Sequence, residues 1–201
     1  MTGPLRIAAL LSGSGRSILN LDRKIREGAL DAEIRTVIAH DPSLPGVARC
    51  RELGLDVNIV DGSSSEACSD MIDEVLKVSE AELICLCGYL RRFRVGELWH
   101  GRVVNIHPAL LPDFGGQGMY GRRVHGAVLN SARRESGCTV HWVDEEYDRG
   151  GIILQGRCEV REDDDIESLA ARVFEIECSI YPQAIERITS RLRAPSGMCK
   201  S

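Results

Sequence analysis

Mostly apolar runs alternate with amphipathic stretches through the first half of the chain. The apolar runs are typical of strands covered on both faces of a sheet. They occupy residues 5–11, 33–40, 55–60, 82–87 and 102–106. Helical spacing and helix-start signals lie between them, at residues 18–27, 45–53, 63–78 and, for a short helix, 95–99. Strands that alternate with helices predict an α/β fold, with one doubly wound, mainly parallel sheet and helices on both faces.

The pattern changes after the fifth predicted strand. Residues 111–123 are rich in glycine and predict a loop, and residues 124–133 predict a helix. Two further strands are predicted at 137–143 and 151–160, joined by the turn 144–150, and these form an antiparallel C-terminal portion. The final helix opens at Asp165, with an apolar stripe of Ile166, Leu169, Val173, Ile176 and Ile180. We expect one domain over residues 1–193 and a disordered tail at 194–201.

Composition and charge narrow the possible partners. The chain has 201 residues, of which 43% are hydrophobic and 27% charged, an ordinary globular balance. The net charge is −5 and there is no basic tract, so nucleic acid is not an expected partner. No secretory segment precedes the first strand, and no apolar run approaches the ~18 residues that span a membrane. We therefore expect a cytoplasmic protein without membrane contact.

The eight cysteines are scattered and contain no CxxC pair. Zinc sites usually bring cysteines together at short spacing, so no metal is expected. Most of these cysteines are interpreted as small buried apolar residues in a reducing compartment. Cys138 and His141 form a weak nucleophile pair, because strand residues three apart point to opposite faces.

The stretch SGSGRS, residues 12–17, follows the first predicted strand and opens a helix. A helix start attracts anions, and Arg16 could add a positive charge there. Ile18 stands where a dinucleotide fingerprint needs its third glycine, and no Lys-Ser/Thr of a nucleotide P-loop follows. The spacing leaves two interpretations open: a cradle for one phosphate, or a tight strand-to-helix turn.

The stretch NIHPALLP places Asn105 and His107 at the end of the fifth predicted strand. Residues two apart in a strand face the same way. An amide and a protonated imidazole can both donate to an oxygen that gains negative charge during acyl transfer. Pro108 and Pro112 stiffen the exit from the strand. The alternative is a structural histidine with a capping asparagine, and the pattern alone does not decide between the two.

Asp148 lies in the turn between the last two predicted strands. A carboxylate beside His107 would raise the pKa of that imidazole, hold its orientation and accept a proton through water. The alternative is an ordinary hairpin turn, where Asp before Gly is common. His141 is interpreted as a buried, hydrogen-bonded histidine. We interpret the other histidines as ordinary surface or packing residues: His40, His100 and His125.

Four motifs together resemble those of the folate-dependent formyltransferases. They are the SGSG loop, CGYLRRF, NIHPALLP and SGCTVHWVDEEYDRGGIILQ, and the similarity covers residues 5–190. The length and the phosphate loop favour the glycinamide ribonucleotide formyltransferases of purine biosynthesis. The resemblance implies that a formyl group passes from the co-substrate 10-formyltetrahydrofolate to the amine of glycinamide ribonucleotide. The amine attacks directly, through a tetrahedral intermediate, and no metal is needed.

The resemblance also implies site residues by position. Asn105, His107 and Asp148 match the catalytic residues, and His141 matches a supporting histidine. The positions matched to substrate binding are Gly15, Arg16 and Ser17 for the phosphate and Glu177 for the ribose. The positions matched to folate binding are Leu90, Arg91, Arg92, Phe93, Asn105, Asp144, Glu145, Glu146 and Tyr147.

Several positions depart from the family's common pattern. Arg16-Ser17 stands in place of Ser-Asn and adds a direct charge at the phosphate. A folate-contacting arginine is replaced near Ser65, and Phe174 replaces a polar residue one turn before Glu177. The segment 114–126 is longer than the family's common form, so the resemblance does not define how this loop covers the substrate.

Other functions remain open at this stage. A formyltetrahydrofolate hydrolase would use water in place of the amine, and a related formyltransferase would act on a different amine. A non-catalytic nucleotide- or folate-binding module is a third possibility. The expected partners are small molecules, and the expected oligomeric state is a monomer or homodimer.

Overall fold

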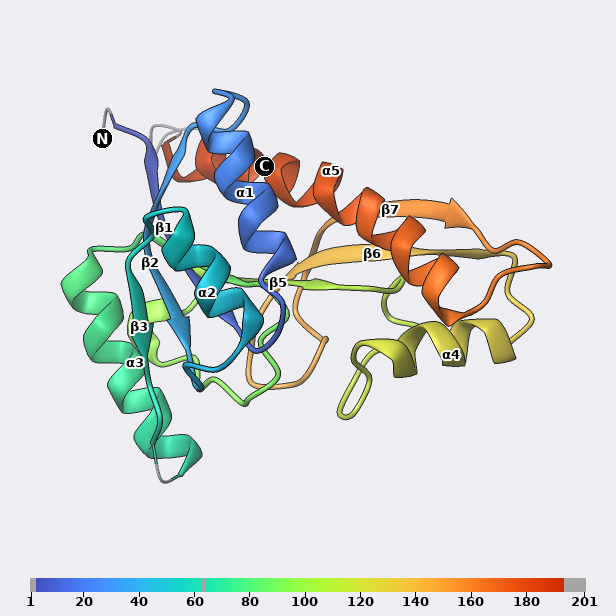
Figure 1. Ribbon diagram of the computed structural model, residues 1–201, viewed down its shortest axis with the longest axis horizontal. Helices are drawn as coiled ribbons and strands as arrows, with labels where there is room; N and C mark the ends of the chain where they lie inside the picture. The colour runs from blue at the N-terminus through green and yellow to red at the C-terminus, as the bar shows by residue number, and fades with distance from the viewer. Residues whose placement is uncertain (1–2, 63, 194–201) are drawn as a thin grey trace, which may run out of the picture.

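The structure of the protein is a computed structural model, which describes residues 3–62 and 64–193. Seven strands form one sheet in the order β3-β2-β1-β4-β5-β6-β7 (Figure 1). The strands are β1 Leu5–Leu11, β2 Ala32–Ala39, β3 Val57–Ile59, β4 Leu83–Leu86, β5 Val103–His107, β6 Glu135–Trp142 and β7 Ile152–Glu159. The first five are parallel to one another, whereas β6 pairs antiparallel with both of its neighbours, β5 and β7. The predicted fold class is therefore confirmed, and the tail at 194–201 lies outside the described residues.

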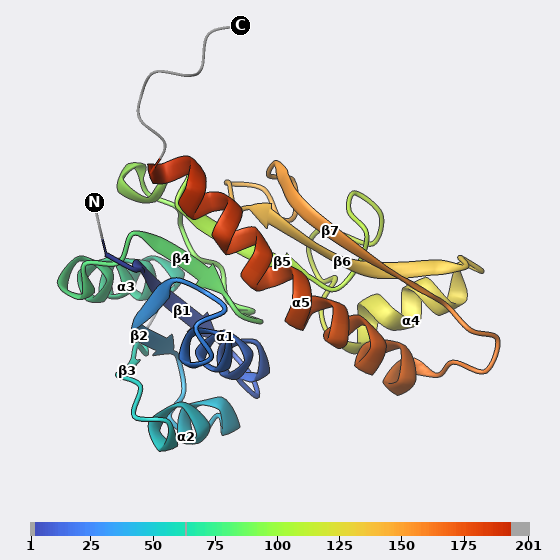
Figure 2. The same cartoon turned by 90° about the horizontal axis from the view of Figure 1, so that it is seen from above.

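Helices cover both faces of this sheet (Figure 2). They are α1 Arg16–Arg26, α2 Pro45–Glu52, α3 Ser65–Ser79, α4 Arg122–Asn130 and α5 Ile166–Arg193, with a short 3-10 helix η1 at Glu97–Trp99. One buried cluster unites the sheet with α1, α2 and α5. A second cluster packs α3 and η1 on the opposite face. This two-sided burial explains why the strands read as nearly continuous apolar runs.

Helix α5 crosses the sheet and ties its two halves together. Leu169, Val173 and Ile180 of the predicted stripe are buried. The hydroxyl of Tyr181, which is 1% exposed, donates to the Leu86 carbonyl oxygen at 3.1 Å. Helix α5 is thus hydrogen-bonded to the last residue of the central strand β4.

Element boundaries differ from the prediction in a few places. Helix α4 begins at Arg122, two residues before the predicted start, because Gly121 turns the backbone with φ 54°. Strand β3 has only three residues and lies at the sheet edge. Ser64 caps α3 by accepting from the Ala67 N–H at 3.1 Å, while Ser63 lies outside the described residues.

Among the seven cysteines that the structure describes, five are buried, as expected: Cys50, Cys68, Cys85, Cys87 and Cys138. Cys199 lies outside the described residues. Cys158 and Cys178 are partly exposed. Burial raises the pKa of the Cys138 thiol well above its ordinary value. That thiol is therefore neutral, and a neutral thiol is a poor nucleophile. Among the described residues, no helix is both long and apolar enough to cross a membrane.

Candidate active site

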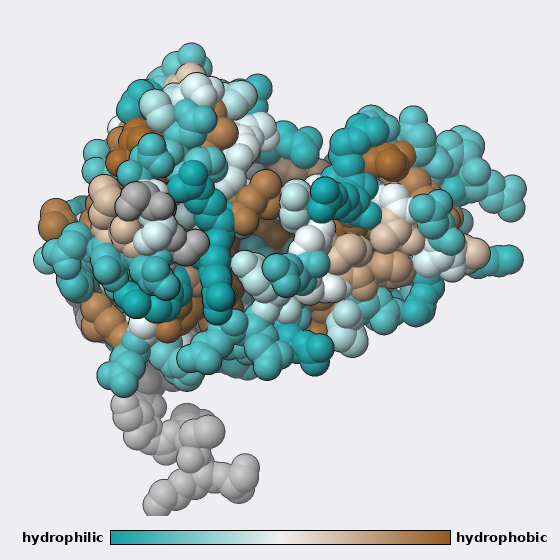
Figure 3. Space-filling view, turned by 90° about the horizontal axis from the view of Figure 1, so that it is seen from below, coloured by the Kyte–Doolittle hydropathy of each residue, from teal (hydrophilic) through white to brown (hydrophobic). Residues whose placement is uncertain are grey.

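A cavity of about 1010 Å³ opens along the carboxyl ends of β1, β4 and β5. Figure 3 shows this face of the molecule hollowed, with hydrophobic residues at its floor and mainly hydrophilic ones around it. Its lining includes the residues matched to the family site: Gly15, Arg16, Ser17, Leu90, Arg91, Arg92, Phe93, Asn105, His107, His141, Asp144, Glu145, Glu146, Tyr147, Asp148 and Glu177. The fold thus brings four separate sequence motifs to one place.

The antiparallel register of β5 and β6 places His141 directly opposite Asn105. The Asn105 Nδ2 atom lies 3.2 Å from His141 Nε2. On the far side of the ring, His141 Nδ1 lies 2.8 Å from the carbonyl oxygen of Trp142. A carbonyl only accepts, so Nδ1 carries a proton and donates it to Trp142, while Nε2 faces the asparagine amide.

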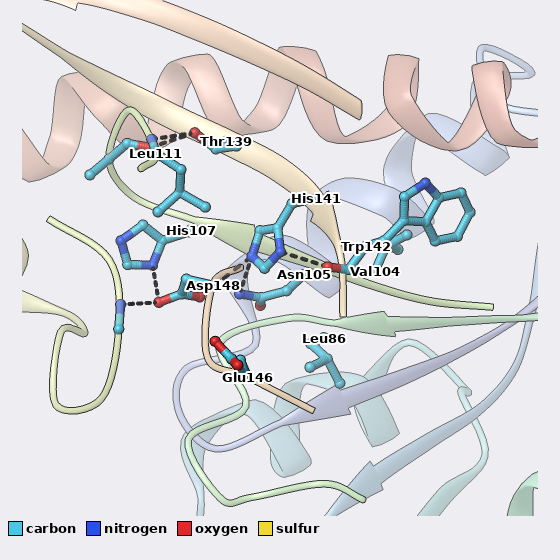
Figure 4. A network of polar contacts seen from close by, with 12 residues as sticks. Leu86, Val104, Asn105, His107, Leu111, Thr139, His141, Trp142, Glu146 and Asp148 are labelled. Atoms are coloured by element: carbon cyan, nitrogen blue, oxygen red, sulfur yellow. Dashed lines mark hydrogen bonds and ion pairs between the residues drawn. The ribbon is translucent and has the colours of Figure 1, made fainter. Parts of the chain in front are cut away.

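Asp148 lies between two imidazoles (Figure 4). Its Oδ2 atom is 3.5 Å from His107 Nδ1, and its Oδ1 atom is 3.4 Å from His141 Nε2. The N–H of Gly116 also donates to Oδ2 at 2.9 Å. The backbone of Asp148 turns with φ 57°. The structure therefore brings Asp148 beside His107, as the resemblance implied, and adds His141 on its other side.

The outer nitrogen of His107 is also occupied. Nε2 lies 2.8 Å from the carbonyl oxygen of Phe114, so Nε2 carries a proton and donates it there. Phe114 has φ 55°, a left-handed conformation that is uncommon outside glycine. Asn105 and His107 thus reach the same cavity, but in the free protein each already has a partner within the chain.

Burial decides the charge of His107. It lowers the pKa of this imidazole, while the Asp148 carboxylate and the Phe114 carbonyl act to raise it and His141 acts to lower it. The net direction is down. Asp148 thus acts to raise this pKa, as expected, but it does not keep the imidazole charged in the free protein. The His107 side chain is only 3% exposed, and its loss of hydration outweighs the attraction of the carboxylate.

Asp148 remains ionised at neutral pH. Burial acts to raise its pKa, but the hydrogen bond with His141, the charge of His107 and the Gly116 N–H outweigh burial. The net pKa lies below the ordinary value. A carboxylate held in this way is a ready proton acceptor beside two imidazoles.

The loop before α1 leaves helix N–H groups open to the cavity. Gly15 occupies the N-cap position with φ 73° and provides no side-chain cap. A Cβ atom at Gly15 would lie 3.0 Å from the Gly46 Cα atom, so both the backbone conformation and the close approach favour glycine. Arg16 and Ser17 follow in the first helical turn. Unpaired N–H groups at a helix start are a suitable setting for an anion.

Glu177 lies on α5, at the side of the cavity near this loop. Burial raises the pKa of its carboxyl to about 7, and Arg16 opposes that rise. Glu177 is therefore partly protonated at neutral pH and can either donate to or accept from a hydroxyl.

The residues matched to folate binding form two facing segments. Leu90–Phe93 follow β4, where the Leu90 N–H donates to the Ser12 hydroxyl at 3.0 Å and Phe93 is buried. Asp144–Tyr147 form the facing turn, where Asp144 Oδ1 accepts from the Glu146 N–H at 3.0 Å. Tyr147 is 47% exposed. The departure at Ser65 lies outside the side chains that the structure describes.

Sequence reasoning missed three groups at the site. His125 was interpreted as an ordinary packing residue, but its side chain lines the cavity and is 5% exposed. Its Nδ1 atom has no hydrogen-bond partner among the described residues. The other two are the Phe114 carbonyl and the Gly116 N–H, which are backbone groups and leave no signal in residue identity.

Within the described ranges, no group of three or more His, Cys, Asp or Glu side chains could hold a metal ion. The set around Asp148 consists of one carboxylate, two imidazoles and one amide. That set can donate to a developing oxyanion and move a proton, which are the two requirements of acyl transfer to an amine.

Comparison with known proteins gives one family. Residues 5–185 match the family model described as formyl transferase. The chain is 34% identical over 195 residues to the trifunctional purine biosynthetic protein adenosine-3 of Gallus gallus, covering 94% of this chain but 19% of that protein. It is 31% identical over 194 residues to the phosphoribosylglycinamide formyltransferase of Haemophilus influenzae, covering 94% of this chain and 89% of that one.

The structural comparison agrees. Glycinamide ribonucleotide transformylase 1 from Symbiobacterium toebii superposes with a TM-score of 0.86 at 33% sequence identity. The match covers 98% of this chain and 93% of that chain. The chain therefore shares its fold, nearly end to end, with a solved enzyme of this group.

Proposed function

The chain belongs to the formyl transferase family, and from that premise we propose that it transfers a formyl group from 10-formyltetrahydrofolate to the amine of glycinamide ribonucleotide, a step of purine biosynthesis. The single observation that carries the proposal is the placement of Asp148 between His107 and His141, inside a cavity that also holds the loop at Gly15. The proposal treats residues 1–193 as one formyltransferase domain.

Each end of the cavity suits one substrate. The open helix start at Gly15–Ser17 and the Arg16 charge suit the phosphate, and Glu177 suits the ribose hydroxyls. The segments Leu90–Phe93 and Asp144–Tyr147 suit the folate at the other end. The amine and the formyl carbon would then meet beside Asn105, His107 and Asp148.

The proposed reaction needs no covalent enzyme intermediate and no metal. The amine nitrogen attacks the formyl carbon, and the carbonyl electron pair moves onto oxygen. The N–H groups of Asn105 and His107 stabilise that oxyanion. Asp148 takes the extra proton from the attacking nitrogen and, through water, returns it to folate N10. The oxyanion then reforms the carbonyl, the bond to N10 breaks, and tetrahydrofolate leaves.

His107 would act in its neutral form. Its pKa is lowered in the free protein, and a neutral imidazole N–H is a competent donor to an oxyanion. In the free protein the Nε2–H group of His107 donates to the Phe114 carbonyl. In the proposed complex the formyl oxygen takes that carbonyl's place, and the Asn105 amide likewise leaves His141.

An assay of the folate product tests the function. The purified chain is supplied with 10-formyltetrahydrofolate, and formation of tetrahydrofolate is followed spectrophotometrically with and without glycinamide ribonucleotide. We expect product only when the ribonucleotide is present, together with a formylated ribonucleotide detected by mass spectrometry.

The other outcomes separate the alternative functions. Release of formate without the ribonucleotide would support a formyltetrahydrofolate hydrolase. Turnover with another amine only would support a different formyltransferase. Binding of both ligands without turnover would reduce the protein to a binding module, and each of these results would overturn the proposal.

A further inference from the structure

The guanidinium of Arg16 lies over an aromatic ring from another part of the chain. Its guanidinium carbon is 4.1 Å from the ring centroid of Phe174. Arg16 is the first residue of α1, while Phe174 lies in α5. A guanidinium group stacks on an aromatic face through both its charge and its planarity. Phe174 therefore supports one face of the Arg16 head group.

The edge of the same guanidinium is free. Among residues 3–62 and 64–193, no hydrogen bond and no ion pair within 4 Å engages Arg16. Its side chain is exposed and lines the cavity beside the open start of α1. An arginine whose face is held and whose N–H groups are unused is arranged for bidentate binding of a phosphate.

Two helices hold this pair together. The α1 and α5 helices lie side by side in Figures 1 and 2. The buried Asn20 side chain joins them by donating to the Cys178 carbonyl oxygen at 2.9 Å. Phe174 itself follows the buried Val173 in the same helix turn. The ring is thus placed by the helix packing, and the exposed Arg16 side chain lies over it.

We propose that Phe174 is a positioning residue for phosphate recognition, which presents the Arg16 guanidinium edge to the substrate phosphate. This inference rests on the proposed function and names a further specificity determinant of the same site. A lysine at position 16 could not use the ring in this way, because an ammonium group is a compact point charge without a planar face.

Binding calorimetry on the full chain tests the inference. The two ligands are glycinamide ribonucleotide and the corresponding ribonucleoside, which lacks the phosphate. Phe174→Leu removes the ring but keeps apolar volume, and we expect it to weaken ribonucleotide binding by about three- to tenfold. The same variant should bind the ribonucleoside as the wild type does. Phe174→Trp keeps an aromatic face and should bind the ribonucleotide within about twofold of wild type.

A double-mutant cycle separates positioning from a structural role. Arg16→Ala alone should weaken ribonucleotide binding, and adding Phe174→Leu should then cause little further loss, because the ring acts through the arginine. The Kd for the folate should stay unchanged in every variant. If Phe174→Leu weakened both ligands equally, or weakened binding by the same factor in the Arg16→Ala background, the ring would have only a structural role.

The outcomes also distinguish this inference from the proposed function. A wild-type chain that binds the ribonucleotide but is insensitive to Phe174→Leu would contradict the inference and leave the function standing. A wild-type chain that does not bind the ribonucleotide would overturn both.

Discussion

Asp148 is the residue on which the proposed proton transfer depends. It touches His107 through one oxygen and His141 through the other. A carboxylate can lie against two imidazoles at once, because it has two oxygen atoms in one rigid plane. Its lowered pKa keeps Asp148 ionised at neutral pH and able to accept a proton.

Asp148→Asn keeps the shape of the side chain but removes its charge and its basicity. We expect kcat to fall by about 10²- to 10⁴-fold, the usual contribution of a positioned acid–base group, with both substrates saturating. Steady-state kinetics checks this. Asp113→Asn is the control, because it removes an exposed carboxylate paired with Arg133. A kcat within twofold of wild type for Asp148→Asn would rule out the proposed role.

Glu177 should make the free energy of unfolding depend on pH. Burial raises its pKa to about 7 from an ordinary 4.5, so the folded state holds this proton more tightly than the unfolded state does. Below pH 4.5 the carboxyl is protonated in both states and has no effect. As the pH rises from 4.5 to 7, Glu177 ionises in the unfolded state but stays protonated in the folded state. Ionisation favours the unfolded state, so the wild type becomes less stable than a variant with a neutral side chain at this position.

Glu177→Gln supplies that neutral side chain. We expect the free energy of unfolding of the variant to exceed that of the wild type by about 1–2 kcal/mol at pH 8, after allowance for partial exposure, and by much less near pH 5. Urea unfolding at the two pH values measures this. The same difference at both pH values would show that the pKa of Glu177 is not raised.

At the scale of elements, the segment 114–121 controls the site through its backbone. The Phe114 carbonyl accepts from His107, and the Gly116 N–H donates to Asp148. Gly116 and Gly118 have φ values of 100° and 86°, which side chains other than glycine rarely adopt. The unusual backbone at Phe114 and Gly116 therefore sets the two contacts.

Gly116→Ala should disturb the bond to Asp148 and raise the pKa of that carboxyl. Since the ionised form is the proposed proton acceptor, the acid side of the pH profile of kcat/KM should move to higher pH. Gly118→Ala is a matched control, because it strains the same loop but touches neither catalytic group. The profile of Gly118→Ala should keep its acid limb, and equal shifts in both variants would refute the assigned bond.

The elements themselves followed closely from the sequence. The apolar run at residues 5–11 is β1 residue for residue, because burial on both faces leaves Arg6, near the start of the strand, as its only polar residue. The Phe114 partner of His107 and the Gly116 partner of Asp148 could not be predicted. They depend on the left-handed backbone at Phe114 and on a contact between residues 116 and 148, neither of which residue identity encodes.

Only part of the site could be predicted, because its contacts also depend on how the strands and helices pack. Asn105 and His141 could be placed in strands, but their pairing came from the β5–β6 register. His125 gave no signal beyond its place on a helix, and only the packing of α4 shows it in the cavity wall. The roles of these residues remain predictions.

At the scale of the whole molecule, an acidic protein presents a cavity with segregated charge. The net charge is −5. Arginines line the cavity at the phosphate loop and after β4, whereas carboxylates gather in the facing turn at 144–148. An anionic substrate is thus attracted to particular ends of the cavity and not to the surface in general.

Salt should therefore slow the binding of the ribonucleotide but have little effect on the rate of the chemical step. We expect kcat/KM for the ribonucleotide to fall severalfold between about 10 and 150 mM ionic strength, where the Debye length shortens from about 30 to 8 Å, with kcat nearly constant. The ribonucleoside without its phosphate serves as the control and should show a smaller change. Equal salt dependence for the two would contradict recognition of the phosphate by charge.

A structure of the complex with glycinamide ribonucleotide and a non-reactive analogue of 10-formyltetrahydrofolate tests the central claim most directly. We predict that the formyl oxygen, or its analogue, lies within hydrogen-bonding distance of Asn105 Nδ2 and His107 Nε2, with the Phe114 carbonyl displaced from the imidazole. The substrate amine should lie within reach of Asp148, directly or through one water. A complex in which His107 still donates to Phe114, while the reacting atoms lie elsewhere in the cavity, would contradict the proposed chemistry.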